Sequence, residues 1–280
     1  MVPFENVAEE ERVLSASDGV ALQVRLCCPT VKTRAVLCLV HGHGDHAARF
    51  ADGIDVLLRA GLAVVAFDLR GHGLSGGARG DCPSYDALLD DIGRVVTLSE
   101  QRFPDKALFL FGHSLGGNLA LNYALRRASG LSGIVVVNPW LDLAFRVAPW
   151  KLAVVRLMNA VRPGFPMSTG RRSWTSCQAE VDVDSLVHRT MTPRLFCGAG
   201  EAARWASAHA ADLTLPLLAI HGVDDRSTSC EATRRFCLRV AGGSRYVARE
   251  GLGHDIHGAE EERPLFAAVA AWIVEHLDQE

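Results

Sequence analysis

The sequence has no excess of charge of one sign and no long hydrophobic run. Its 29 Lys and Arg residues face 32 Asp and Glu residues, and no run of Lys and Arg is longer than two. This balance excludes the clustered basic side chains with which proteins neutralise nucleic-acid phosphates. No stretch of about 18 uncharged apolar residues occurs, which excludes a membrane-spanning helix. Hydrophobic residues make up 49% of the chain, enough for a packed core, so a disordered chain is excluded as well.

Cysteine is scarce and has no metal-binding spacing. The chain has eight cysteines in 280 residues, and none stands in a C-x-x-C pattern, so neither a disulfide scaffold nor a structural zinc site is predicted. The segment MVPFENVAEEERVL at the start carries four glutamates and lacks the basic and apolar regions of a signal peptide. These features predict reduced thiols and a cytoplasmic protein.

Short apolar runs alternate with helical patterns along most of the chain. Residues 35–40 (AVLCLV) are almost wholly apolar, as a strand buried on both faces must be. Apolar residues recur at helical spacing over residues 85–96 and 265–277. This alternation predicts an α/β protein with a mostly parallel sheet and helices on both faces. The predicted strands are residues 21–28, 35–40, 62–67, 107–111, 132–137, 216–220 and 244–250.

The alternation breaks between residues 144 and 212, where no clean strand pattern occurs and prolines are frequent. This segment is too long for a simple loop, so we expect an α/β core of residues 1–143 and 213–280 with a helical cap of residues 144–212. Residues 150–161 (WKLAVVRLMNAV) predict an apolar helix surrounded by basic side chains. Two interpretations stay open: a helix that faces lipid or acyl chains, and a helix packed on the core.

The pattern G-x-S-x-G, which can mark a nucleophilic serine, occurs twice. In residues 112–116 (GHSLG), Ser114 directly follows a predicted strand and precedes a predicted helix, which is the setting of a nucleophile elbow. In residues 73–77 (GLSGG), Ser75 lies in a glycine-rich loop with no adjoining helix. We therefore predict Ser114 as the nucleophile. Its neighbour His113 is expected to pack or hydrogen bond rather than to act as a base.

Both partners that such a serine needs follow late strands. A serine hydroxyl is a weak nucleophile, so it needs a general base and an acid that orients the base. Asp224 and Asp225 follow one late strand, and His254 and His257 follow the next. The carboxyl ends of these strands would bring both loops to Ser114.

The turn after residues 35–40 is the predicted source of an oxyanion hole. The backbone N–H groups of His43 and of Leu115, the residue after the serine, are the expected pair of donors. His41, His46 and Asp45 in the same turn match no standard ligand spacing, and a hydrolytic triad needs no metal. We therefore predict no metal and no cofactor.

Together these motifs resemble the α/β-hydrolase superfamily, and within it the monoacylglycerol lipase and lysophospholipase group related to serine aminopeptidases. HGHGDHAARF is similar to that group's HGxGEHxxRY, and DLRGHGLSGG is similar to its DxxGHGxSxG. GHSLGG, HGVDDR and EGLGHDIHG follow in the expected order over nearly the whole chain. The resemblance implies an α/β-hydrolase fold with a helical cap over an acyl tunnel.

The resemblance also implies roles for particular residues. It selects Asp225 as the triad acid and His254 as the base. By position, Asp45, Arg49 and His257 match the residues that form the glycerol end of the site in monoacylglycerol lipases. Aspartate at position 45 is one methylene shorter than the glutamate of the group.

The resemblance implies a serine hydrolase that cleaves esters of lipid-like substrates, of the monoacylglycerol or lysophospholipid type. Its expected partner is a small acyl ester, with membrane-surface contact through the cap and no nucleic acid. Aminopeptidase or thioesterase activity is an alternative, because Glu180, Asp182 and Asp184 in the cap could hold a substrate ammonium. A non-catalytic binding protein of the same fold is the rival from another class.

Overall fold

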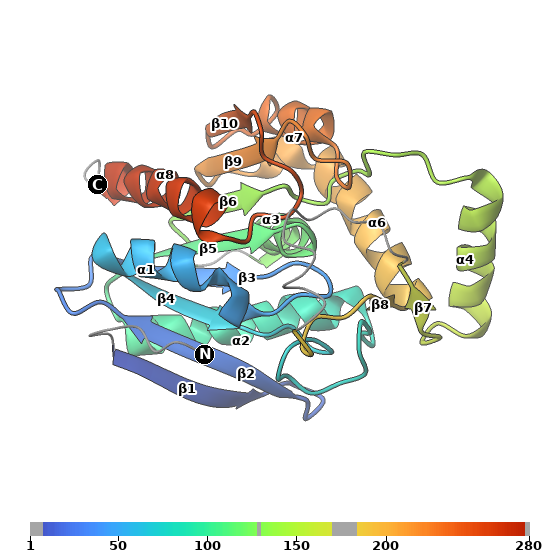
Figure 1. Cartoon of the computed structure of the whole chain (residues 1–280), viewed down its shortest axis with the longest axis horizontal. Helices are drawn as coiled ribbons and strands as arrows, with labels where there is room; N and C mark the ends of the chain where they lie inside the picture. The colour runs from blue at the N-terminus through green and yellow to red at the C-terminus, as the bar shows by residue number, and fades with distance from the viewer. Residues whose placement is uncertain (1–7, 128–129, 170–183, 278–280) are drawn as a thin grey trace.

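The protein is built around one eight-stranded sheet (Figure 1). This computed structural model describes residues 8–127, 130–169 and 184–277, and the strands lie in the order β1-β2-β4-β3-β5-β6-β9-β10. β2 pairs antiparallel with β1 and β4, and the other pairings of this sheet are parallel. The strands are β1 (Ala8–Ser15), β2 (Ala21–Cys28), β3 (Ala35–Val40), β4 (Leu62–Phe67), β5 (Ala107–His113), β6 (Gly133–Val137), β9 (Leu217–Gly222) and β10 (Ser244–Arg249).

The mostly parallel sheet predicted from the sequence is confirmed. All predicted strands are present, and their ends agree with the sequence patterns within about two residues. β3 shows why the apolar runs of the sequence predicted buried strands. Val36, Cys38 and Val40 belong to the core cluster on one face of the sheet, while Leu37 and Leu39 belong to the cluster on the other.

The sequence analysis missed β1. Its residues, AEEERVLS, are almost all exposed, so they carry no hydrophobic alternation. β1 pairs only with β2, and Glu9 of β1 accepts a hydrogen bond of 2.7 Å from Nε of the buried Arg25 on β2. Charged residues are usual on an edge strand because they prevent further strands from adding.

Helices cover both faces of the sheet, as predicted. α1 and α8 pack on each other and on one face, and α2, α3, α6 and α7 cover the other. A 3₁₀ turn, η1 (Ala47–Phe50), leads into α1. The helices are α1 (Ala51–Arg59), α2 (Tyr85–Arg102), α3 (Leu115–Arg127), α6 (Pro193–Ala208), α7 (Cys230–Cys237) and α8 (Ala259–Leu277).

The segment between β6 and β9 contains a helix that stands away from the body of the protein. Figure 1 shows α4 (Pro149–Val161) at the side of the molecule, next to α6. No residue of α4 is buried, and Trp150 and Leu157 are 66% and 64% exposed. The interpretation that this helix packs on the core is therefore wrong. The segment also contains β7 (Met167–Ser168), β8 (Thr190–Met191) and η2 (Ala210–Asp212).

The described residues show the state of the cysteine thiols and the character of the helices. Seven cysteines lie in the described ranges, and all seven are free thiols, as expected. Among the helices of these ranges, none combines the length and the apolar character that a bilayer-crossing helix requires.

The close contact of α1 with α8 depends on a glycine. A Cβ added to Gly53 of α1 would lie 2.6 Å and 2.7 Å from Cε2 and Cγ of the fully buried Phe266. We therefore expect Gly53→Ala to lower the free energy of unfolding by about 1–3 kcal/mol, because the ring has no space to move. Urea unfolding of the variant and the wild type measures the difference.

Gly93→Ala in α2 is the matched control. A Cβ there meets only Tyr123, at ordinary contact distances of 3.6 and 3.7 Å. The better helix propensity of alanine should leave this variant as stable as the wild type, or about 0.5–1 kcal/mol more stable. Equal effects of the two substitutions would contradict the packing argument.

Candidate active site

Ser114 lies at a sharp turn between β5 and α3. Its φ is +53°, a conformation that residues with a side chain rarely adopt. A Cβ on Gly112 would overlap the carbonyl oxygen of Gly116, and a Cβ on Gly116 would overlap that of Val40. The turn can thus form only with glycine at both positions. This is the strand, turn and helix geometry expected for a nucleophile elbow.

Ser75, the serine of the second G-x-S-x-G pattern, is used in quite another way. Its Oγ–H donates to the carbonyl oxygen of Asp68 at 2.6 Å, and its oxygen accepts from the backbone N–H of Gln23 at 2.8 Å. The side chain is buried and fixes its loop to β2. Its hydroxyl group is therefore committed to the backbone.

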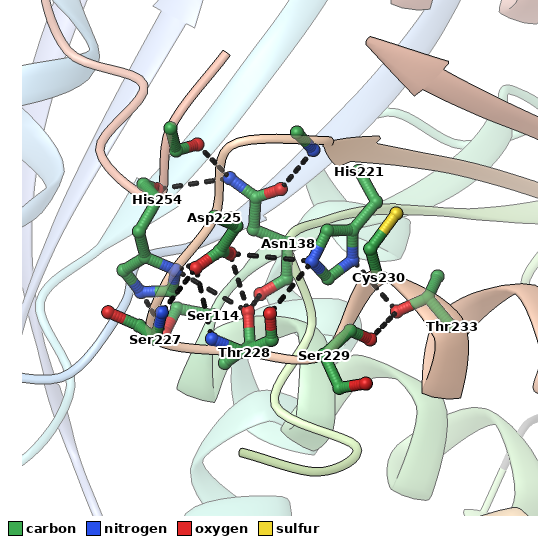
Figure 2. A network of polar contacts seen from close by, with 12 residues as sticks. Ser114, Asn138, His221, Asp225, Ser227, Thr228, Ser229, Cys230, Thr233 and His254 are labelled. Atoms are coloured by element: carbon green, nitrogen blue, oxygen red, sulfur yellow. Dashed lines mark hydrogen bonds and ion pairs between the residues drawn. The ribbon is translucent and has the colours of Figure 1, made fainter. Parts of the chain in front are cut away.

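The structure brings the predicted serine, base and acid into one chain of hydrogen bonds (Figure 2). Oγ of Ser114 lies 2.9 Å from Nε2 of His254, and Nδ1 of His254 lies 2.8 Å from Oδ2 of Asp225. The carboxylate accepts a hydrogen bond from Nδ1–H of His254, so Nε2 carries no proton and its lone pair faces the serine. Asp224, the other aspartate of the loop, is exposed and instead accepts from the backbone N–H of Gly251 at 3.1 Å.

Asp225 is held by several donors besides His254. Oδ1 accepts from the backbone N–H groups of Ser227 and Thr228, at 2.7 and 3.0 Å, and Oδ2 accepts from the Thr228 hydroxyl at 2.7 Å. Burial acts to raise the pKa of Asp225, but hydrogen bonding from His221 and His254 outweighs it, so the pKa lies below its usual range. The carboxylate is therefore ionised at neutral pH.

A second histidine approaches the same carboxylate. His221 is fully buried, and its Nε2 lies 3.2 Å from the carbonyl oxygen of Thr228 and 3.4 Å from Oδ2 of Asp225. Both neighbours only accept, so Nε2 carries a proton. Nδ1 lies 2.9 Å from Oγ1 of Thr233 on α7. The sequence analysis missed His221, although it directly follows the predicted strand of residues 216–220 and stands four residues before Asp225.

The loop that carries His254 is fixed by two further side chains. Nδ2 of Asn138 donates to the carbonyl oxygens of Gly253 and His254 at 2.9 and 3.0 Å, and its Oδ1 accepts from the N–H of Gly222 at 2.8 Å. Nε2 of His113 donates to the carbonyl oxygen of His254 at 2.9 Å, which confirms the expectation that His113 hydrogen bonds. Asn138 was missed, and its signal is a polar residue directly after the buried strand GIVVV.

The turn after β3 lies against the serine. A Cβ on Gly42 would be 3.2 Å from the Cβ of Ser114 and 3.2 Å from Nδ1 of His113. The backbone N–H of His43 has no acceptor among the residues that the structure describes. Leu115 is the first residue of α3, where backbone N–H groups have no partner within the helix. Both amides predicted for an oxyanion hole thus flank the serine.

The histidines of this turn point to separate partners. Nε2 of His41 accepts from the N–H of Leu69 at 2.9 Å, Nε2 of His43 lies 2.8 Å from the carbonyl oxygen of Thr190, and Nε2 of His46 lies 2.8 Å from Oδ2 of Asp184. These rings do not converge on one point, as a metal site would require. Two of the contacts fix the turn to residues 184–190.

Asp45, Arg49 and His257, the predicted substrate-binding residues, lie together in a buried charged cluster. Oδ2 of Asp45 accepts from Nε2 of His257 at 2.6 Å, and its Oδ1 accepts from Arg49 at 3.1 Å. Nδ1 of His257 donates to Oε1 of Glu262 at 3.1 Å. Burial acts to lower the pKa of His257, but the charge of Asp45 and the hydrogen bonds that the ring donates to Asp45 and Glu262 raise it to about 10. His257 is therefore a buried cation.

One group within the described residues has the spacing of a metal site. The nearest ligand atoms of Asp45, His113 and His257 all lie within 4.8 Å of one another. Both ring nitrogens of His257 donate to carboxylates, so this ring has no lone pair to offer a cation. The donor set fits an ion-pair network better than a metal.

The family of the chain can now be stated. Residues 31–262 match the family described as "Serine aminopeptidase, S33". The chain belongs to this family. The motif resemblance found in the sequence is thereby confirmed, and the site described above lies within or directly beside the matched residues.

The relatives of this chain include lipases of similar length. It is 29% identical to a monoacylglycerol lipase of Mycolicibacterium smegmatis, covering 95% of this chain and 98% of that protein. It is 28% identical to the monoglyceride lipase of Mus musculus, covering 97% and 91%. The solved structure of Paleococcus ferrophilus monoacylglycerol lipase matches with a TM-score of 0.80 and 27% identity, covering 90% and 99%. The fold of the S33 chain is thus the α/β-hydrolase fold.

Because His257 is charged in the folded protein, the free energy of unfolding should depend on pH above neutrality. Because its pKa is raised from 6.5 to about 10, the folded protein binds one more proton than the unfolded chain between these values. The free energy of unfolding should therefore fall by about 1.4 kcal/mol per pH unit over this range. His257→Gln should remove most of that decline and cost about 3 kcal/mol at pH 7, because it leaves the buried Glu262 without a cation and Asp45 with Arg49 alone.

Chemical unfolding between pH 6 and 10 measures both effects. His276→Gln removes a histidine near the end of α8, whose ring hydrogen bonds to the carbonyl oxygen of Trp272, and should keep the wild-type slope. Parallel pH profiles of the wild type and His257→Gln would contradict the buried cation.

Proposed function

We propose that this protein is a serine hydrolase that cleaves carboxylic esters of lipid-like substrates through an acyl-enzyme. The observation that supports this proposal most directly is the unbroken chain from Oγ of Ser114 through His254 to Asp225, at 2.9 and 2.8 Å. Such a chain activates a serine for attack on an acyl carbonyl. No cofactor is needed for this chemistry.

The first half of the reaction forms the acyl-enzyme. Oγ of Ser114 attacks the ester carbonyl carbon while its proton moves to Nε2 of His254. Asp225 keeps the proton of Nδ1 in place and stabilises the imidazolium that forms. The backbone N–H groups of His43 and Leu115 bind the oxyanion of the tetrahedral intermediate, and the alcohol leaves with the proton from His254.

The second half returns the enzyme to its starting state. Water gives a proton to Nε2 of His254 and attacks the acyl carbon, and Ser114 leaves with that proton as the carboxylic acid is released. Asn138 and His113 keep the imidazole in place during both halves through the carbonyl oxygen of His254. His221 and Thr228 do the same for the carboxylate. These four are positioning residues.

Two observations support lipid-like esters as substrates. The relatives reported above are named monoacylglycerol or monoglyceride lipases. The matched positions Asp45, Arg49 and His257 lie together, as an alcohol subsite would require. The two ring nitrogens of His257 are already engaged, and Oδ1 of Asp45 also accepts from the backbone N–H of His46 at 2.8 Å, so Arg49 is the group left to meet the alcohol of the substrate.

Aminopeptidase and thioesterase activity remain the alternatives on the same triad. An aminopeptidase needs a free carboxylate pair for the substrate ammonium. Asp184 is already bound to His46 at 2.8 Å and to the N–H of Leu186 at 3.0 Å. Glu180 and Asp182 lie outside the described residues. The geometry therefore supports ester cleavage better.

Residues 144–212 are proposed as the cap, with α4 as a membrane contact. Trp150, Val154, Leu157 and Val161 recur at the spacing of one helical face, and each is at least half exposed. An exposed apolar face of this kind is typical of a helix that lies in a membrane interface. The proposal is of peripheral contact only.

Replacing Ser114 tests the catalytic proposal. We expect Ser114→Ala to lose labelling by a fluorophosphonate probe and to lose about 10⁴-fold or more in kcat/KM on p-nitrophenyl esters. Ser75→Ala is the matched control, because its hydroxyl is bound to backbone groups, and this variant should still be labelled. A chain-length series of esters, assayed beside an aminoacyl anilide and an acyl thioester, separates the alternatives.

Each other outcome has a definite meaning. Turnover retained in Ser114→Ala would exclude Ser114 as the nucleophile. Faster cleavage of the anilide or the thioester would establish an alternative activity. A folded wild-type protein that is not labelled would support the non-catalytic binding protein.

Replacing one residue of α4 tests the membrane contact. We expect Leu157→Asp to reduce sedimentation with phosphatidylcholine vesicles about tenfold, because a charge on this face opposes insertion. Val31→Asp, at another exposed apolar residue, should bind vesicles like the wild type. Equal vesicle binding of wild type and Leu157→Asp would exclude α4 as the contact.

A further inference from the structure

Residues 184–192, which lie within the proposed cap, pack against two loops of the core. On one side the backbone N–H of His188 donates to the carbonyl oxygen of Gly44 at 2.9 Å. On the other side the N–H of Thr192 donates to the carbonyl oxygen of Gly80 at 3.0 Å. A Cβ on Gly44 would overlap the carbonyl oxygen of His188, so these two backbones are in close contact. Residues 184–192 are therefore fixed both to the turn after β3 and to the loop that carries Gly80.

The side chain of His43 binds the same segment. Its Nε2 lies 2.8 Å from the carbonyl oxygen of Thr190. A carbonyl oxygen only accepts, so Nε2 carries a proton and donates this hydrogen bond. The backbone N–H of His43 is the proposed oxyanion donor. The bond to Thr190 thus holds the residue whose N–H must meet the oxyanion.

The ring of His188 holds the backbone of Thr190 in turn. Nδ1 of His188 accepts from the backbone N–H of Thr190 at 3.3 Å, and its Nε2 donates to the carbonyl oxygen of Gly71 at 3.1 Å. A ring that accepts at one nitrogen and donates at the other is uncharged. His188 therefore fixes the peptide that His43 binds, and it fixes that peptide to a third part of the core.

The rings of His43, His72 and His188 pack together at this junction. Their centroids lie 4.6–5.6 Å apart, and Nδ1 of His72 donates to the carbonyl oxygen of Arg70 at 2.9 Å. Burial lowers the pKa of His43 and of His188 to about 4, and that of His72 well below its usual value. The three rings are thus uncharged at neutral pH and can lie in contact without repulsion.

We propose that residues 184–192 hold the turn after β3 in its catalytic shape, with His43 and His188 as positioning residues for the oxyanion hole. The inference rests on the proposed function, and it adds that this part of the cap contributes to the rate of the chemical steps rather than to substrate binding alone. An oxyanion donor is effective when its N–H already points to the place where the negative charge develops. A turn that is held by β3 and by residues 184–192 meets this requirement.

Two substitutions of His43 test the hydrogen bond, and both keep the backbone N–H. We expect His43→Leu to lower kcat about tenfold or more with little change in KM, because oxyanion contacts strengthen in the transition state. The amide of His43→Gln can still donate to Thr190, so this variant should stay within about threefold of the wild type. Equal losses in the two variants would overturn the inference.

Two esters separate positioning from a change in the shape of the cap. p-Nitrophenyl acetate has an acyl group too short to gain much from a cap, whereas p-nitrophenyl octanoate has a long one. A misplaced oxyanion donor slows both esters by the same factor, because both form the same oxyanion. A loss confined to the KM of the octanoate would overturn the inference, since it would show that residues 184–192 only shape an acyl pocket.

A double-mutant cycle tests whether the two histidines act through one segment. His188→Leu should lower kcat by a factor similar to that of His43→Leu. In the double variant the loss should stay near that of either single variant, because both substitutions release the same peptide at Thr190. Losses that multiply to about a hundredfold would contradict action through a common segment.

His209→Leu is the matched control. This histidine also lies within the proposed cap, and its Nδ1 bonds to the carbonyl oxygen of Trp205 at 2.8 Å. The variant loses a bond between a histidine and a carbonyl group of the same kind and should keep the wild-type kcat. Far-UV circular dichroism checks that each variant is folded. If His43→Leu does not fold, His43→Asn, whose amide is too short to reach Thr190, takes its place.

Hydrogen exchange of residues 41–46, followed by mass spectrometry, tests the positioning without any substrate. These amides should exchange at least about threefold faster in His43→Leu than in the wild type or His43→Gln, because the turn has lost one of its supports. Unchanged exchange would overturn the inference, whether or not the protein cleaves esters.

Failure of this inference can be told apart from failure of the proposed function. Ser114-dependent cleavage with the same kcat in wild type and His43→Leu would overturn the positioning role and leave the function standing. Cleavage of no ester by the wild type would contradict the function. In that case, hydrogen exchange of residues 41–46 still decides whether residues 184–192 hold the turn.

Discussion

The site depends on the close approach of three backbone segments at the elbow. Gly112 is the second-last residue of β5, Gly116 is the second residue of α3, and neither leaves room for a Cβ against its neighbours. Because Gly116 contacts the carbonyl oxygens at the end of β3, this approach also places the turn after β3 beside Ser114. The positive φ of Ser114 is tolerated because the surrounding elements hold it in place. The serine, the turn that carries the proposed oxyanion donor His43, and the sheet are thus fixed by one packing constraint.

The histidines around this point show how burial and partners decide the charge of a side chain. His41, His43, His72 and His188 form a group of rings with centroids 4.6–5.6 Å apart. Burial lowers the pKa of His43 and of His188 to about 4, so both are neutral where the enzyme is expected to work. His257 is equally buried but has a carboxylate at each ring nitrogen, and it is charged. Neutral histidine rings therefore pack on one side of the turn after β3, and an ion-pair network contacts the other side.

The sequence predicted the sheet and the triad because both leave strong local patterns. Buried strands such as β3 must be apolar on both faces, and the elbow requires glycines at fixed spacing. β1, by contrast, is an exposed edge strand with no such pattern, and it was missed. Asn138 and His221 were missed for a different reason, because their roles arise from contacts that form only on folding. Asn138 contacts residues 84 and 116 positions away, and His221 contacts residues 4 and 12 positions away. The resemblance pointed to Asp45, Arg49 and His257. It did not point to Glu262, in the first turn of α8, which helps to make His257 a cation.

α4 is apolar on more than one face, and this explains why its sequence allowed two interpretations. Trp150 and Leu157 lie on an exposed apolar face, whereas Leu152 and Val155 line a groove between α4, α6 and α7. When apolar residues surround a helix nearly all round, its hydrophobic period alone cannot distinguish a helix of the core from an exposed one. Arg156 provides the distinction, because an unpaired guanidinium is costly in a packed core, whereas on this helix it is exposed to solvent.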